Sequence, residues 1–370
     1  MYRNFIFIIF SSLIISILSC NGSVKSEYYE DATGPVNLVS VFADQEIYDN
    51  LLPVLQDSTV FGRIFPGLYY PPEVMFGIRQ FDSDLLKRFK NTRLILDVVS
   101  GNNEIVFEKN KFAKPQAYVK VSGNSIAEIS EILKQNQDSL INFYRWADRE
   151  FVLSGNKSKA RQETTQLDNL GVELLVPRDF SVVETNNDFV WFRKDNFNVI
   201  HNRHEADGGI VTDRSQDILN IMVFKVPFAK NEITREDAWF VLDSITRLYT
   251  KGSKPPQELY LKTNQGKDSI KTLMTDYIQI ERNPALSEFY DFEKVQSTQY
   301  NEIYEAQGWW SMTLSQMGGP FTAKIIFDKQ NKTMYVADAV LFAPLNQGVS
   351  KKRDYITQME SLFTTFKIKK

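Results

Sequence analysis

Apolar residues in the first half of the chain follow two spacings, which predict both helices and strands. Segments 45–55 and 126–151 carry apolar residues at helical spacing, and Asn124 or Ser125 is a suitable cap for the second segment. Short, mostly apolar runs predict strands at 37–42, 93–99, 104–108 and 116–121. We expect these segments to form an antiparallel sheet with helices packed on it.

Strand-like runs dominate the second half. They lie at 172–176, 180–184, 189–193, 218–226, 274–280, 296–304, 309–315, 321–328 and 333–342. Thr234 is expected to cap a helix that ends at Tyr249, and a closing helix is expected to begin at Ser350. The whole pattern predicts an α+β fold of mostly antiparallel sheets with packed helices, arranged as two α+β modules.

The module boundary is predicted from a polar stretch at residues 156–169, in which Leu167 and Ala160 are the exceptions. We therefore expect five parts along the chain. They are a lipoprotein signal peptide over 1–19, a flexible tether over 20–35, an N-terminal α+β module over 36–155, a linker over 156–169 and a C-terminal α+β module over 170–370.

The beginning of the chain has the pattern of an export signal. Arg3 precedes an apolar run from Phe5 to Leu18, which is shorter than a membrane span, and Ser19 precedes the single cysteine, Cys20. This arrangement resembles a bacterial lipobox, whose cysteine carries lipid on its thiol. The alternative is an ordinary secretory signal with an unpaired thiol beside its cleavage site. Lipidation with palmitate-type acyl chains would attach the protein firmly to a membrane.

The tether suggests which face of the envelope the protein occupies. Surface-exported lipoproteins of some bacteria carry acidic residues directly after the lipid-bearing cysteine. Here Asn21, Gly22 and Ser23 come first, and the acidic residues begin only at Glu27. We therefore expect a lipid-anchored protein on the periplasmic face of the outer membrane rather than on the cell surface.

The charge of the chain argues against one class of partner. The 370 residues carry a formal net charge of −3, and loss of Arg3 with the signal would lower it by one. A nucleic-acid-binding protein needs a concentrated basic surface, so we expect no nucleic acid partner. The 27 Phe and 16 Tyr residues are enough for a sizeable core without disulfides.

The two histidines of the chain, His201 and His204, are close together in sequence. His-x-x-His with the nearby acidic residues Glu205 and Asp207 has ligand types that suit zinc. The segment runs into Gly208-Gly209, which predicts a loop, and two solvated histidines at a strand end are the simpler interpretation. We expect no metal here and no cofactor elsewhere, since the sequence has no P-loop and no nucleophile elbow.

Two aromatic segments are candidates for a binding surface. Trp309 and Trp310 are adjacent, so a strand would send their side chains to opposite faces. Trp310 is assigned to the core, and Trp309 to a more polar face where it could contact a protein or glycan. Tyr69 and Tyr70 precede two prolines in a segment that is predicted to be irregular, and this too could contact a partner or simply cover the core.

Four segments of the chain together resemble an uncharacterised family of Bacteroidetes lipoproteins, a domain-of-unknown-function family. They are the lipobox, Tyr70-Pro71-Pro72-Glu73, the segment from Gly171 to Pro177 and the Trp309-Trp310…Gly318-Gly319-Pro320-Phe321 segment. The resemblance implies an envelope lipoprotein and implies no activity. The layout of the second half also resembles the Mog1/PsbP-type sandwich.

The leading hypothesis is a non-enzymatic binding or assembly lipoprotein, attached to the membrane through Cys20, with an envelope protein or a glycan as partner. The alternative is a hydrolase or metal-dependent enzyme that uses His201 and His204.

Overall fold

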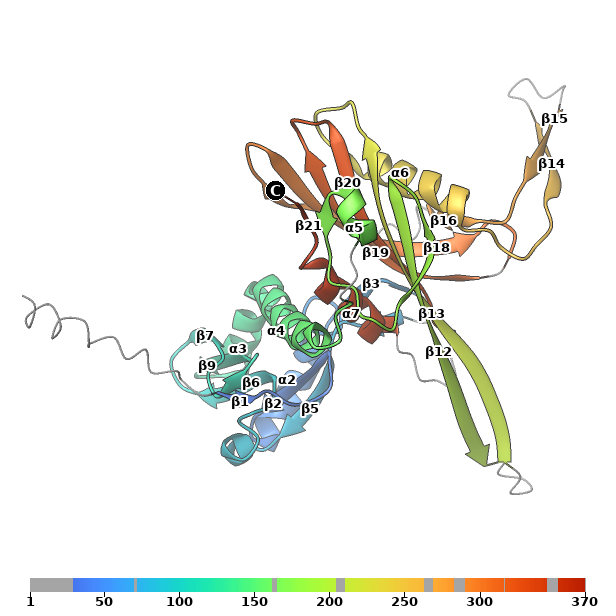
Figure 1. The fold of residues 1–370 in the computed structure, drawn as a ribbon. Helices are drawn as coiled ribbons and strands as arrows, with labels where there is room; N and C mark the ends of the chain where they lie inside the picture. Colours follow the sequence, from blue (N-terminus) through green and yellow to red (C-terminus); the bar gives the residue numbers. More distant parts are fainter. Residues whose placement is uncertain are drawn as a thin grey trace, which may run out of the picture.

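The computed structural model describes residues 29–69, 72–161, 165–203, 210–262, 269–282, 290–315, 317–344 and 352–369. The first half is built on a five-stranded sheet with the strand order β5-β2-β6-β9-β7 (Figure 1). These strands are β2 (Leu38–Phe42), β5 (Gly77–Phe81), β6 (Leu94–Ser100), β7 (Glu104–Lys109) and β9 (Ala117–Gly123).

The antiparallel sheet predicted for the first half is wrong, because β5, β2, β6 and β9 are parallel and only β7 runs antiparallel. The nearly continuous burial of β2 and β6 is typical of parallel strands, which are covered on both faces. Pairing direction depends on the connections between strands, and the apolar pattern of a single strand does not encode it.

Three helices cover one face of this sheet, namely α2 (Gln45–Leu55), α3 (Ile126–Gln135) and α4 (Gln137–Lys157). Of the two caps that the sequence allows, Ser125 is the one that caps α3, since its hydroxyl accepts a hydrogen bond from the Glu128 backbone. The single predicted stripe is broken into two helices at Asn136. The opposite face carries a small aromatic cluster beside the 3₁₀ helix η1 (Ser83–Lys87).

The second half contains one large antiparallel sheet. Its strands are β11 (Ser181–Thr185), β12 (Phe189–Arg203), β13 (Ile210–Pro227), β20 (Thr333–Phe342), β19 (Gly318–Asp328), β18 (Asn301–Met312) and β16 (Ile278–Ile280) in spatial order, and β17 (Asp291–Ser297) also pairs with β18. The molecule is therefore an α+β protein of mostly antiparallel sheets, as the apolar pattern predicts.

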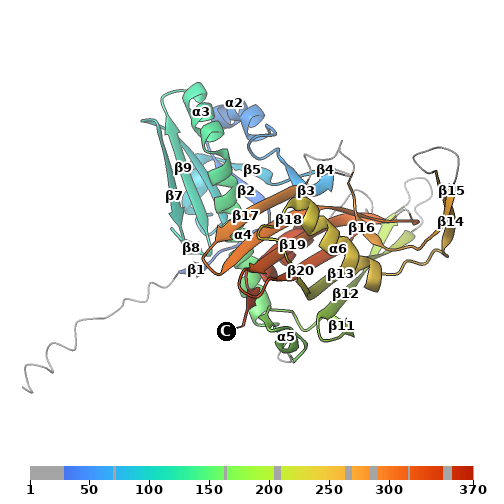
Figure 2. The ribbon, with the colours of Figure 1, turned by 90° about the horizontal axis from the view of Figure 1, so that it is seen from above.

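Helices cover both faces of the large sheet. The helix α6 (Arg235–Tyr249) closes one apolar core over strands β16, β18, β19 and β20, and it lies across the sheet in Figure 2. The closing helix α7 (Lys352–Phe363) packs on the other face, between the large sheet and α4 (Figure 1). The buried residues around α7 continue into the first half, so the two halves share one hydrophobic core.

The remaining elements are short. They are β1 (Glu30–Asp31) paired with β8 (Ala113–Lys114), β3 (Ile64–Tyr69) paired with β4 (Pro72–Val74), α5 (Thr165–Leu170), and β10 (Val172–Glu173) paired with β21 (Lys367–Ile368). The segment 65–75, predicted to be irregular, is thus largely a hairpin. Residues 156 and 157 are the last two of α4, Ala160 forms a bridge to Pro177, and α5 begins within the predicted linker.

The predicted tether is too long, because its last residues belong to the fold. β1 pairs with β8, and Ala32 is buried. The guanidinium of Arg93 donates to the carbonyls of Gly34 at 2.9 Å and Pro35 at 2.6 Å, and its Nε donates to Asp148 at 2.6 Å. Both members of this ion pair are fully buried. Polar composition predicted a flexible segment, but backbone carbonyls can satisfy a buried arginine whatever their side chains are.

Two hairpins project from the large sheet (Figure 1). β13 pairs with β20 only from Ile218 onward, so residues 196–203 of β12 and 210–217 of β13 form a ribbon of their own. The second hairpin consists of β14 (Gln257–Lys262) and β15 (Ser269–Met274), which pair with each other alone. We call these the long ribbon and the short ribbon.

Candidate functional site

The structure separates the residues singled out from the sequence. Cys20, Tyr70 and His204 lie outside the described residues. Tyr69 is the last residue of β3, and His201 lies in β12 opposite Thr212, so the loop predicted at His201 is wrong at that residue. Within the described ranges, no group of three or more His, Cys, Asp or Glu residues could hold a metal ion.

Trp310 is buried in the core beneath α6, as predicted, and its indole donates to the Leu341 carbonyl at 3.0 Å. The exposure predicted for Trp309 is wrong, because only 9% of this residue is exposed. Gly318 lies against its indole, and the ammonium of Lys352 is 5.3 Å from the ring centroid. The polar residues next to Trp309 on the same face of its strand suggested that this face is exposed to solvent. In the structure, the first half of the chain packs near this face of β18.

β3 and β18 also approach each other closely beside Trp309. Gly67 has φ of 78°, and a side chain there would meet the Gly308 backbone, so the two strands are in contact. A partner therefore has little access to the indole of Trp309, and we no longer regard it as a binding residue.

A polar cleft lies where the two halves meet. It has a volume of about 530 Å³, and β3, α4 and the start of β17 line it. Arg63 and Asp138 form an ion pair of 2.9 Å between its walls. Arg145 also lines the cleft and bonds to Glu360 of α7 at 2.6 Å. Clefts between structural units are frequent ligand sites, so this is a candidate on geometry.

The far wall of the cleft is acidic. Glu293 of β17 stands directly opposite Glu305 of β18, and Asp291 lies two residues along. Burial and these two neighbouring carboxylates raise the pKa of Glu293, while Arg145 and Arg149 oppose the shift. Arginines on one side and carboxylates on the other suit a ligand of mixed charge, or hold the halves together. Neither Asp291 nor Arg145 stands out in the sequence, because the cleft assembles from segments over 200 residues apart.

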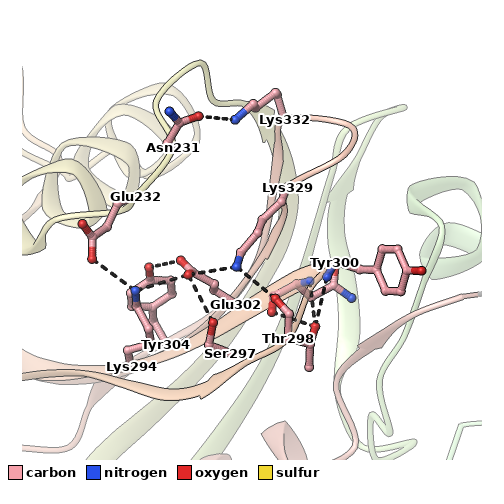
Figure 3. A network of polar contacts seen from close by, with 11 residues as sticks. Asn231, Glu232, Lys294, Ser297, Thr298, Tyr300, Glu302, Tyr304, Lys329 and Lys332 are labelled. Carbon is pink, nitrogen blue, oxygen red and sulfur yellow. Dashed lines mark hydrogen bonds and ion pairs between the residues drawn. The ribbon is translucent and has the colours of Figure 1, made fainter.

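A second cluster of charges surrounds Glu302 at one end of β18 (Figure 3). Its carboxylate accepts hydrogen bonds from Tyr304 at 2.5 Å and Ser297 at 3.3 Å. It also forms ion pairs with Lys329 at 3.1 Å and Lys294 at 3.3 Å. Burial raises the pKa of Glu302, but these contacts outweigh it and bring the pKa to about 2. A carboxylate that is so fully satisfied has a structural role, joining β17, β18 and the turn after β19.

Asp338 is the opposite case. It is fully buried in β20, on the face that α6 covers, and neither carboxylate oxygen has a hydrogen-bond partner among the described residues. Burial, with a smaller contribution from Asp243 of α6, raises the pKa of Asp338 to about 8. Since both oxygens are sealed from solvent, this acid has no access to a substrate in this conformation.

None of the described helices combines the length and the apolar character that a membrane crossing requires. Comparison with family models gives two matches. The model described as "Domain of unknown function (DUF4837)" matches residues 158–365, which is more than half of the chain. The model described as "Domain of unknown function (DUF8532)" matches residues 32–157. A search of the curated proteins finds no match to this chain.

Proposed function

The chain belongs to the DUF4837 family of unknown function, and from this premise we propose that it is a lipid-anchored envelope protein that binds a partner protein through its long ribbon. The anchor is the lipid on Cys20. The location is the periplasmic face of the outer membrane, since the acidic residues of the tether come late. The role is binding or assembly rather than catalysis, because the sequence has no catalytic motif.

The observation that carries this proposal is the length of the long ribbon beyond the sheet. Eight residues on each strand, 196–203 and 210–217, extend it by about 25 Å. A two-stranded hairpin is marginally stable in water, and both of its edges present unpaired backbone N–H and C=O groups. Phe197 near its base is 75% exposed. A partner that adds a strand to an edge would cover these groups.

The base of the long ribbon is braced, which suits an element that must hold its direction. Asp217 is 3% exposed and accepts a hydrogen bond from the Tyr355 hydroxyl of α7 at 2.8 Å. Asn196 donates to the same hydroxyl at 3.4 Å. The ribbon is thereby fixed to the shared core, while its outer part pairs with no other described strand.

The point where the tether joins the fold is far from the short ribbon. Nine residues lie between Cys20 and Glu30, so the tether spans at most about 35 Å before it reaches β1. β1 and the short ribbon are at opposite ends of the molecule in both views (Figures 1 and 2). An anchored molecule would therefore hold β1 near the membrane and its short ribbon farther away.

The test is site-specific photo-crosslinking in cells. A benzophenone amino acid at Phe197 should give one discrete crosslinked product, which mass spectrometry identifies. The same probe at Lys134, an exposed residue of α3, is the control and should give no such product. No product at Phe197, or the same product at both positions, would refute the proposed surface.

A shortened variant separates binding from stability. Phe197 and Gln216 are opposite residues, so residues 198–215 can be replaced by an Asn-Gly turn of two residues. This variant should keep its melting temperature and lose the partner in a pull-down with the identified protein. Retention of the partner would contradict the proposal.

A further inference from the structure

We propose that the first half of the chain binds an anionic amphiphile, a molecule with an alkyl chain and a carboxylate or phosphate head. The site is a pocket of about 340 Å³ on the sheet face opposite α2–α4. Its walls come from β2, β5, the segment after η1 and the docked residues Thr33–Pro35. This volume lies within the range of small-molecule sites in proteins.

The head group has two polar side chains to bind. Ser40 and Arg79 are neighbours in the parallel register of β2 and β5, so they lie side by side on one face of the sheet. Ser40 is 4% exposed and lines the pocket, yet its hydroxyl has no hydrogen-bond partner in the described part of the chain. Arg79 is exposed, and among the described residues its guanidinium forms no ion pair. A hydroxyl beside a free guanidinium suits a carboxylate or phosphate.

The rest of the pocket suits an alkyl chain. Leu38, Phe81 and Phe89 line it, and the Phe81 ring lies 4.9 Å from that of Phe89 and 5.2 Å from that of Phe42. The aromatic rings fix one another, so the apolar wall is already formed without a ligand. Each methylene that enters such a site strengthens binding by about fourfold.

The pocket lies beside the point where the tether joins the fold. Arg93 holds the carbonyls of Gly34 and Pro35, and these two residues form part of the pocket wall. Under the proposed function the bilayer is within reach of this point, and a bilayer is a source of anionic amphiphiles. Only this step depends on the lipid anchor; the pocket and its polar pair do not.

The experiment is a fluorescence titration with 11-(dansylamino)undecanoic acid. It uses a chain from residue 20 onward with Cys20→Ser, which keeps every described residue and carries no lipid of its own. The probe should bind saturably at one site per chain. Arg79→Gln should weaken binding about tenfold or more, because a charge-assisted hydrogen bond is lost. Lys87→Gln removes an exposed cation of η1 that does not line the pocket, and should leave binding unchanged.

Competition by ligands with the same chain identifies the head group. Dodecanoate or dodecyl phosphate should displace the probe at least tenfold better than dodecanol, and Arg79→Gln should abolish this preference. The better of the two anions shows whether a fatty acid or a phosphate-bearing lipid is the source. The proposal fails if binding is not saturable, if Arg79→Gln and Lys87→Gln behave alike, or if dodecanol competes as well as the anions. Both measurements use purified protein without a lipid anchor. A negative result would therefore refute this site without bearing on whether Cys20 carries lipid.

Discussion

Three buried carboxylates differ in their surroundings, and this sets how each responds to pH. Arg93 and the Asn37 backbone pair with Asp148, although burial still raises its pKa. Burial raises the pKa of Glu302, but Tyr304, Lys329 and Lys294 outweigh it and bring the pKa to about 2. Asp338 has no hydrogen-bond partner among the described residues. The partners of Asp148 come from distant segments, so only the folded chain shows that this carboxylate is satisfied.

We predict that Asp338→Asn flattens the pH dependence of stability. The folded pKa of Asp338 is about 8, against about 3.9 in an unfolded chain. Its contribution to folding is therefore complete below about pH 4 and declines as the pH rises through 8, by about 1.4 kcal/mol per pH unit. In urea unfolding, the variant should gain stability over the wild type between pH 5 and pH 8. Asp179→Asn removes an exposed ion pair and should leave the pH dependence of the unfolding free energy nearly as in the wild type. If the unfolding free energies of Asp338→Asn and the wild type changed with pH in parallel, the prediction would be contradicted.

Glu302→Gln should have its effect on the acid side. The pKa of Glu302 is lowered in the folded state, so its stabilisation is present above about pH 4.5 and is lost as the pH falls toward about 2. We expect the variant to lose about 1–3 kcal/mol at pH 7, since charged hydrogen bonds are lost. The difference should shrink at pH 2–3. An equal difference at pH 7 and pH 2.5 would show that packing, not charge, is responsible.

At the scale of the element, helix starts follow from local sequence. Ser125 and Thr234 both cap helices at the positions that the sequence predicts, because a cap needs only the residues of the next turn. The break between α3 and α4 at Asn136 is not visible in the apolar stripe, which continues across it. Strand positions are also largely as predicted, whereas the direction of strand pairing in the first half is not.

Thr234→Ala is predicted to destabilise the protein by about 1 kcal/mol. The Thr234 hydroxyl accepts from the Asp237 backbone at 3.2 Å, and the Asp237 carboxylate accepts from the Thr234 backbone at 3.2 Å. Thr234→Ser keeps the hydroxyl and should retain most of this stability. The comparison is made by chemical denaturation, and an equal loss in both variants would exclude the cap as the cause.

At the scale of the whole molecule, the two halves are not independent in structure. The core around α4 and α7 extends into both, and Arg145, Glu360 and Gln307 connect them through polar contacts. The family models meet at residues 157 and 158, so this boundary in sequence does not separate two hydrophobic cores. The proposed anchor, at the start of the first half, would thus hold the entire molecule.

Cys20→Ser should release the protein from the membrane fraction and abolish labelling by an alkyne fatty acid. The reason is that a lipidated cysteine would supply the several acyl chains that stable anchoring needs. Ser19→Ala keeps a small residue before Cys20 and should behave as the wild type. Equal labelling of the wild type and Cys20→Ser would refute the anchor.

The sequence by itself determined the α+β class, most strand and helix positions and two helix caps, because these depend on spacing and on contacts within a turn. It also placed Trp310 in the core. The tertiary structure alone decided the parallel pairing of β2, β5, β6 and β9, the burial of Trp309, and the docking of Gly34 and Pro35 by Arg93. Each of these depends on contacts between segments far apart in the chain, and a local pattern carries no record of its distant partner.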